Sequence, residues 1–290
     1  MRESGDHDVV RAFEQERRRL RARQSVVGLG VGAAFLVAVV SAGRITELSP
    51  VAILEGLPEI GAYFAKTVPE LRWETLGADL AAWYHDLQTW LLLLLDTLLI
   101  AVMASLAGVG GALLLCFSAS RNLAPHSTVY FAARRLLEFA RTVPEVVWAL
   151  VFVVAFGVGP LAGFLALAVH SVGALGKLYA EVNENVETKP IEALQAVGAN
   201  RFEVLRFGVL PQVSPGYATY TLWRVELNLR AAAILGFVGA GGIGAELHKA
   251  ISFHRYEDIS ALLLLIIGTV VVLDLVSEAV RHRIIGAEQL

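Results

Sequence analysis

Charged residues are scarce in this chain. Aspartate, glutamate, lysine and arginine make up 18% of its 290 residues, against roughly 25% in average soluble domains. Hydrophobic residues make up 56%, and the mean hydropathy is +0.61. A single buried core does not need so large an apolar fraction, so the composition excludes an ordinary soluble protein.

Cysteine and the short motifs of common enzymes are scarce too. The single cysteine, Cys116, excludes an intrachain disulfide. The sequence contains no H-E-x-x-H, C-x-x-C or G-x-x-x-x-G-K-[ST] motif, so no zinc-protease helix, redox pair or phosphate-binding loop is predicted. The histidines have no metal-ligand spacing, and His170, inside an apolar run, is expected to be a hydrogen-bonded packing residue. We therefore predict no catalytic residue, no metal and no cofactor on this chain.

Long apolar runs are abundant, and they predict an all-α protein that crosses a membrane several times. A helix needs about 20 apolar residues to cross roughly 30 Å of hydrocarbon. Runs with one charge or none supply five such helices, because Gly157, Gly159 and Pro160 divide the longest run into two. A sixth helix is otherwise apolar but carries three charges. The predicted spans are 25–43, 90–118, 142–158, 161–180, 211–240 and 259–276.

Lysine and arginine are concentrated in alternate loops, which predicts the orientation of the chain. Segment 1–24 holds seven arginines, so we place it in the cytoplasm as a basic anchor on anionic lipid, with no nucleic-acid role. The predicted order is a cytoplasmic segment at 1–24, a first span at 25–43, a periplasmic loop at 44–89, a core with five further spans at 90–281 and a cytoplasmic tail at 282–290. Both termini are thus expected in the cytoplasm.

Four glycines near the C-terminal end match the dinucleotide-binding fingerprint G-x-G-x-x-G. They are Gly239, Gly241, Gly242 and Gly244. The fingerprint requires a buried strand before it and a helix after it, whereas a membrane-length helix precedes these glycines. We therefore reject nucleotide binding and predict a turn with closely approaching helices.

The segment 187–211, between two predicted spans, has the pattern of a short helix–turn–helix. Pro190 suits the first turn of a helix, and Gly198 is expected to end that helix. The predicted apolar face is Ile191, Leu194 and Val197. A second amphipathic turn follows, and Pro211 opens the next span. The sequence thus predicts a helical element on the cytoplasmic surface that can contact a soluble partner.

This segment resembles the EAA loop of ABC-importer permeases, whose pattern is E-A-A-x-x-x-G, nine residues, then I-x-L-P. The matching residues are Glu192, Ala193, Gly198, Leu210 and Pro211. Leu194 replaces the second alanine, and Gly208 replaces the isoleucine. Together with the apolar runs around it, from 84 to 284, the segment is similar to the phosphonate-transporter permease family (PhnE).

The resemblance implies a type I ABC-importer permease fold in the bacterial inner membrane. In that family the EAA loop forms a coupling helix that docks on an ATP-hydrolysing subunit, which holds ATP and Mg²⁺. The implied assembly has two ATPase copies, a second permease that is identical or related, and a periplasmic phosphonate- or phosphate-binding protein. The expected cargo is phosphonate or a phosphate- or phosphite-like oxyanion. An importer of another small solute and a secondary transporter are the alternatives.

Polar residues in the fifth predicted span are candidates for the transport pathway. They are Arg224, Glu226, Asn228 and Arg230. Charges inside a membrane are expected to face the interior in pairs, and Glu226 and Arg230 have the four-residue spacing of an ion pair. Arg224 is expected past the bilayer midplane and Arg230 near the external surface, just before the glycines, which the resemblance assigns as a gate. Direct contact with the anion and purely structural pairing are both open for the two arginines.

Overall fold

The computed structural model describes residues 3–46 and 49–286. Within these residues there are helices and no strand, which confirms the all-α prediction. The elements are α1 (Glu3–Ile45), α2 (Pro50–Thr67), α3 (Leu76–Trp83), α4 (Leu87–Cys116), α5 (Ser127–Thr142), α6 (Glu145–Phe156), α7 (Pro160–Glu184), α8 (Thr188–Ala196), α9 (Arg201–Glu203), the π-helix η1 (Val204–Val209), α10 (Leu210–Leu235), the 3-10 helix η2 (Gly236–Val238), α11 (Ile243–Ser252) and α12 (Tyr256–Gly286). Residues 287–290 of the predicted tail and the first two residues of the predicted N-terminal segment lie outside the described ranges.

The chain divides into two compact units, one ending at Ala65 and the other beginning at Lys66. In the first unit, the part of α1 from Arg23 to Ile45 is long and apolar enough to cross a membrane, in agreement with the predicted span at 25–43. Its apolar side chains are exposed, as expected of a helix whose surroundings are lipid.

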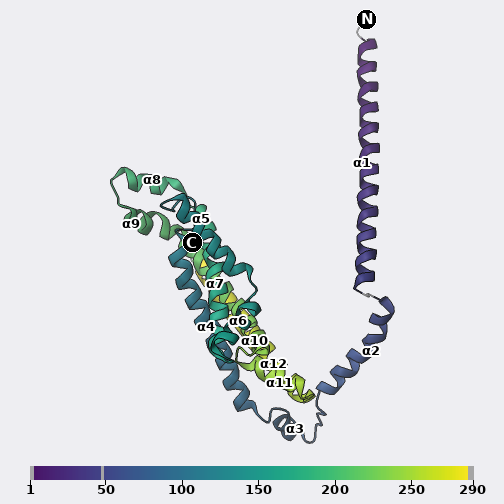
Figure 1. Cartoon of the computed structure of the whole chain (residues 1–290), viewed down its shortest axis with the longest axis vertical. Helices are drawn as coiled ribbons and strands as arrows, with labels where there is room; N and C mark the ends of the chain where they lie inside the picture. The colour runs from purple at the N-terminus through teal and green to yellow at the C-terminus, as the bar shows by residue number, and fades with distance from the viewer. Residues whose placement is uncertain (1–2, 47–48, 287–290) are drawn as a thin grey trace. The chain divides into compact units, whose positions relative to one another are not determined.

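In the second unit, α4, α7 and α10 form the centre of the core (Figure 1). Small residues line their contacts, and Ala104, Ala166 and Ala232 are buried there. Ser171 lies so close to Gly108 that a side chain at Gly108 would collide with it. Close approach through small residues is typical of helices packed in membranes. Within this unit, α8 and α9 lie at one end and α3 and α11 at the other (Figure 1).

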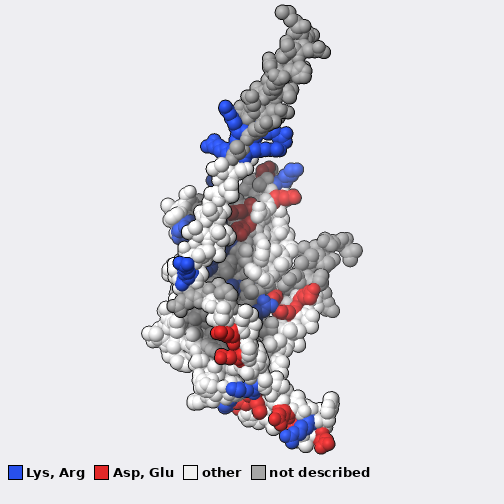
Figure 2. Space-filling view, turned by 90° about the vertical axis from the view of Figure 1, so that its right-hand side faces the viewer, with Lys and Arg blue, Asp and Glu red and all other residues white. Residues whose placement is uncertain are grey.

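Four helices are long and apolar enough to span a membrane by themselves. They are Arg23–Ile45, Leu87–Cys116, Pro160–Glu184 and Tyr256–Val280. Two bent pairs also qualify as broken spans: α5 with α6, and Arg201–Val238 with α11. Uncharged atoms cover most of the described surface in Figure 2, and the charges occur in small separate groups. The predicted count of six agrees with the structure when each bent pair is counted as one span.

The third predicted span, at 142–158, is wrong as a single helix. The chain is helical to Thr142, breaks, and resumes as α6 at an angle of 88°. Pro144 explains the break, because proline lacks a backbone donor and disfavours helical conformation in the residue before it. Val143 is accordingly extended, with φ −74° and ψ 121°. The 12 residues of α6 cover about 18 Å, so α6 needs α5 to complete a crossing.

The predicted periplasmic loop is largely helical, in α2 and α3. In the first turn of α3, the Asp79 carboxylate accepts hydrogen bonds from the Arg72 backbone N–H at 3.0 Å and from the Thr75 hydroxyl at 2.9 Å. These bonds stabilise the charged form and lower the pKa of Asp79 from its ordinary value. The Trp83 indole donates to the Glu257 carbonyl at 3.0 Å, which fixes the end of α3 to α12.

Candidate coupling loop and transport pathway

The helix predicted from the EAA-like segment is α8, which begins at Thr188 and ends at Ala196. Its base is tied to the start of α10, because the Glu187 backbone N–H donates to the Gln212 side-chain oxygen at 2.9 Å. The Gln212 amide in turn donates to the Gly208 carbonyl at 2.6 Å. These bonds hold α8 beside the first turn of α10.

Gly198 ends α8, as the sequence predicts. Its φ is +86°, in the left-handed region that favours glycine. The Gly198 N–H donates to the Gln195 carbonyl and the Ala199 N–H to the Leu194 carbonyl, both at 3.0 Å, which is the Schellman arrangement of a helix end. A side chain at Gly198 would meet no atom within 4 Å. The need for glycine here is therefore a backbone requirement.

The second half of the helix–turn–helix continues into α10. Asn200 and Glu203 form a reciprocal capping box, in which the Glu203 N–H donates to Asn200 Oδ1 at 3.0 Å and the Asn200 N–H donates to Glu203 Oε2 at 2.7 Å. The chain then runs through η1 into α10 without a break. Pro211 lies in the first turn of α10. The loop is thereby joined to α10 by continuous helix.

Several apolar side chains of this loop are exposed. Val197, Phe202 and Phe207 are 81%, 69% and 62% exposed, and Glu192 and Ala193 are exposed on α8; we call these five residues the coupling surface. Val197, predicted on the apolar face of the helix, follows the last residue of α8 and caps the helix end. A group of exposed apolar side chains is typical of a contact surface for another protein.

Leu194 and Gly208, the two departures from the EAA pattern, lie against each other. A side chain at Gly208 would begin 3.0 Å from the Leu194 Cδ1 atom. The larger residue on α8 thus fills the space that the glycine leaves in η1. The two departures compensate in volume, and volume-conserving exchanges are those that packed contacts tolerate best.

This compensation can be tested with a double-variant cycle. Gly208→Ile alone is expected to push α8 away from η1 and to lower uptake about tenfold, because overpacking costs about 1–3 kcal/mol. Leu194→Ala alone should have a smaller effect, because Leu194 is only partly buried. The double variant restores the volume and should regain uptake, measured at matched amounts of membrane protein. A double variant that transports less than Gly208→Ile would contradict the compensation.

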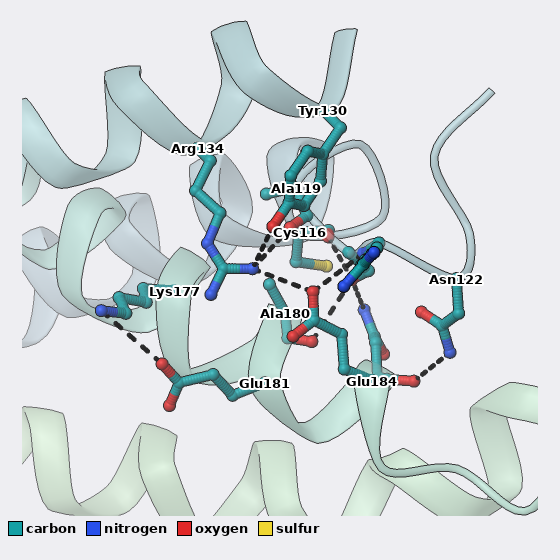
Figure 3. A network of polar contacts seen from close by, with 12 residues as sticks. Cys116, Ala119, Asn122, Tyr130, Arg134, Lys177, Ala180, Glu181 and Glu184 are labelled. Carbon is teal, nitrogen blue, oxygen red and sulfur yellow. Dashed lines mark hydrogen bonds and ion pairs between the residues drawn. The ribbon is translucent and has the colours of Figure 1, made fainter. Parts of the chain in front are cut away.

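A network of polar contacts joins the end of α7, just before α8, to α5 and to the loop after α4 (Figure 3). Glu184 Oε1 accepts hydrogen bonds from Arg134 Nη1 at 2.9 Å and from the Arg121 N–H at 2.8 Å. The Asn122 side chain donates to the Asn183 carbonyl at 2.7 Å. The network therefore fixes the base of the coupling loop to the core.

Arg224 and Asn228 lie inside the core and are joined through Ser171. Arg224 is 7% exposed, and its Nε donates to Ser171 Oγ at 2.9 Å. Asn228 is fully buried, and its amide donates to Ser171 Oγ and Ser105 Oγ, both at 2.9 Å. One polar cluster thus connects α10 with α7 and α4. Hydrogen bonds between membrane helices stabilise such contacts modestly.

Arg230 pairs with Glu226, as predicted, and also with Asp274. Its Nη2 lies 2.7 Å from Glu226 Oε1 and 2.8 Å from Asp274 Oδ2. Asp274 lies about 27 Å along α12 from Tyr256, the first residue of that helix. Arg230 therefore lies beside the middle of α12, and the predicted position near the external surface is wrong. The reason is that the broken span bends by 45° and continues as α11 beyond the glycines.

The glycine segment forms a tight turn between α10 and α11. The residues with left-handed φ are Gly239 (+86°), Gly241 (+82°) and Gly242 (+74°). The Gly159 N–H donates to the Gly239 carbonyl at 2.9 Å, which joins the turn to the start of α7. A side chain at Gly244 would collide with the Ala233 carbonyl. Close packing accounts for all four glycines, and their function as a gate stays a prediction.

Comparison with known proteins decides the family. Residues 111–285 match the family model described as "Binding-protein-dependent transport system inner membrane component". The chain belongs to this family. It is 37% identical over 253 residues to the phosphite transport system permease protein PtxC of Stutzerimonas stutzeri, over 87% of this chain and 88% of that protein. It is 34% identical over 244 residues to the phosphate-import permease protein PhnE of Mycolicibacterium smegmatis, over 84% of this chain and 43% of that protein.

The fold is that of solved importer permeases. A chain of the MetNI methionine ABC transporter in an inward-facing conformation is similar with a TM-score of 0.58 at 18% identity, over 67% of this chain and 95% of that chain. The predicted type I permease fold is therefore confirmed. Family membership also makes this permease a transport component of the inner membrane and decides against the secondary transporter.

Several residues that join these sites were not found from the sequence. Ser105 and Ser171 are single hydroxyl residues in apolar runs, and such residues show no recognisable spacing. Asp274 was visible as the one charge in the last predicted span, but nothing in the sequence names Arg230 as its partner. The pairing of Glu184 with Arg134 was missed for the same reason.

Proposed function

We propose that this permease is the membrane-spanning subunit of an ATP-driven importer for phosphorus oxyanions such as phosphite, phosphate or phosphonate. The observation that carries the proposal is the unbroken connection from the coupling surface through η1 into α10, the helix that bears Arg224 and Arg230. A partner that moves the coupling surface would move these cations with it. The relatives support the class of cargo, because they are a phosphite transport permease and a phosphate-import permease.

In this importer a separate ATPase docks on the coupling surface and holds ATP and Mg²⁺. Two ATPase copies, a second permease and an external binding protein complete the assembly. ATP binding closes the ATPases and brings the two coupling loops together, and the pathway then opens to the outside and receives the anion from the binding protein. Hydrolysis separates the coupling loops and releases the anion inward.

The test is uptake by the reconstituted importer. The permease is purified with its candidate ATPase and binding protein and placed in liposomes. Labelled phosphite, phosphate or methylphosphonate should accumulate only with ATP and the binding protein, whereas sulfate should not. ATP-driven uptake of sulfate alone, or of none of these anions, would contradict the proposal.

The orientation of the permease is tested by thiol labelling in a Cys116→Ser background. Trp73 is 92% exposed and lies in the predicted periplasmic loop, and Arg201 is exposed in the coupling loop. A membrane-impermeant reagent added to intact cells should label Trp73→Cys but not Arg201→Cys. In permeabilised cells the reagent should label both Trp73→Cys and Arg201→Cys. Equal labelling of both in intact cells would show that the topology is wrong.

A further inference from the structure

The break between α5 and α6 brings several ionisable groups together beside α7. The Val143 carbonyl lies 3.1 Å from His170 Nδ1 on α7, so the ring nitrogen donates to it. Glu145, the first residue of α6, has its Oε2 3.6 Å from the same nitrogen. The broken backbone thus supplies an acceptor that a continuous helix would have used within itself.

Arg224 faces this region without a carboxylate partner. Among the described residues, no carboxylate oxygen lies within ion-pair distance of its guanidinium, and its one hydrogen bond is from Nε to Ser171. Among the described residues, Asp274 Oδ1 is the one fully buried side-chain oxygen or nitrogen that has no hydrogen bond. The unbonded terminal nitrogens of Arg224 are therefore not fully buried. Arg224 therefore holds terminal donors that no described residue binds, and the residue is 7% exposed.

Positive charge exceeds negative charge around the break. The charges of Arg224, Arg141 and Glu145 all act on the His170 ring, and Glu145 is the carboxylate whose charge acts on Arg224. Arg141 is the exposed last arginine of α5, and like Arg224 it forms no ion pair with any described residue. Among the charged groups that act on the His170 ring, two guanidinium groups are thus opposed by one carboxylate.

We propose that Arg224 and Arg141 form a transient binding site for a phosphorus oxyanion on the transport pathway, beside His170 at the break between α5 and α6. This inference rests on the proposed function. Arginine matches it chemically, because the planar guanidinium donates two parallel hydrogen bonds to phosphate-like oxygens. The Nε bond to Ser171 fixes the orientation of the Arg224 group and leaves its terminal nitrogens for the anion.

Glu145 suits such a site because a carrier must release its cargo. A pathway site has to bind strongly enough to admit the anion and weakly enough to let it leave. The carboxylate of Glu145 lowers the net positive charge and competes for the same cations when the anion departs. It also compensates part of the positive charge that is otherwise costly inside a membrane.

The first test measures the local charge independently of transport. Thr142 is exposed at the break, so Thr142→Cys in a Cys116→Ser background can be labelled with methanethiosulfonates of opposite charge. The anionic reagent should react faster than the cationic one. Arg224→Gln and Arg141→Gln should each lower the ratio of the anionic to the cationic labelling rate at least about twofold. The control Arg135→Gln with Glu138→Gln removes an ion pair of the same helix without a change of net charge, and it should leave the ratio nearly unchanged. Equal ratios in all four backgrounds would overturn the site.

The second test measures transport per ATP hydrolysed in liposomes with the ATPase and binding protein. Arg224→Gln should lower the ratio of phosphite uptake to ATP hydrolysis about tenfold, the loss expected when a charged hydrogen-bond donor is removed. Arg224→Lys should retain part of the ratio, and Arg135→Gln all of it. If the wild type takes up phosphite and Arg224→Gln has the same ratio of uptake to ATP hydrolysis, the site is overturned but the proposed function is not. Absence of oxyanion uptake by the wild type would instead overturn the proposed function.

Discussion

Replacement of Gly198 by valine is expected to lower ATP-driven uptake about tenfold or more while the permease stays in the membrane. The left-handed conformation costs an ordinary residue about 1–2 kcal/mol, and a β-branched residue is affected most. Since φ at Gly198 is +86°, valine should open the helix end that positions the coupling surface. Uptake is compared at matched amounts of permease in membrane vesicles.

The control for this prediction is Gly198→Asn. Asparagine tolerates the left-handed region, and a side chain at this position meets no atom within 4 Å, so this variant should keep most of the uptake. Co-purification of the ATPase should fall with valine and persist with asparagine. Similar losses in the two variants would show that the backbone conformation of Gly198 is not what matters.

Replacement of Arg230 by leucine is expected to lower the amount of folded permease. It leaves Glu226 and Asp274 facing each other without the cation that binds both, and Asp274 Oδ1 already has no partner. Loss of one partner from a buried ion pair costs up to about 3–5 kcal/mol. Because Arg230 and Asp274 are each partly exposed, we expect the lower value of about 1 kcal/mol, or about a fivefold lower folded-to-unfolded ratio. The measurement is the monodisperse fraction after detergent extraction.

A triple variant separates the structural function of Arg230 from direct contact with the anion. Arg230→Leu, Glu226→Leu and Asp274→Leu together remove all three charges, so assembly and uptake should both recover. The double variant of Arg230 and Glu226 should recover less, because the Asp274 carboxylate is left alone. Recovered assembly with abolished uptake would instead place Arg230 in the transport pathway.

The limits of the coupling loop could be predicted from the sequence because they depend on neighbouring residues. Gly198 sets the end of α8, and the Asn200–Glu203 capping box starts the next turn within four residues. The break at Pro144 has an equally local cause. It was missed because the apolar run around it dominates the hydropathy pattern, which does not register a single proline.

The sequence by itself determined that this is a helical membrane protein with a short helix presented at its surface, because apolar length, glycine and proline act locally along the chain. Only the tertiary structure decided which polar residues meet. Arg224 reaches Ser171 across 53 positions, Asn228 reaches Ser105 across 123, and Arg230 reaches Asp274 across 44. No periodicity encodes such pairs, since each depends on how separate helices pack and rotate against one another. The same holds for Leu194 and Gly208, whose compensating volumes become visible only when α8 lies against η1.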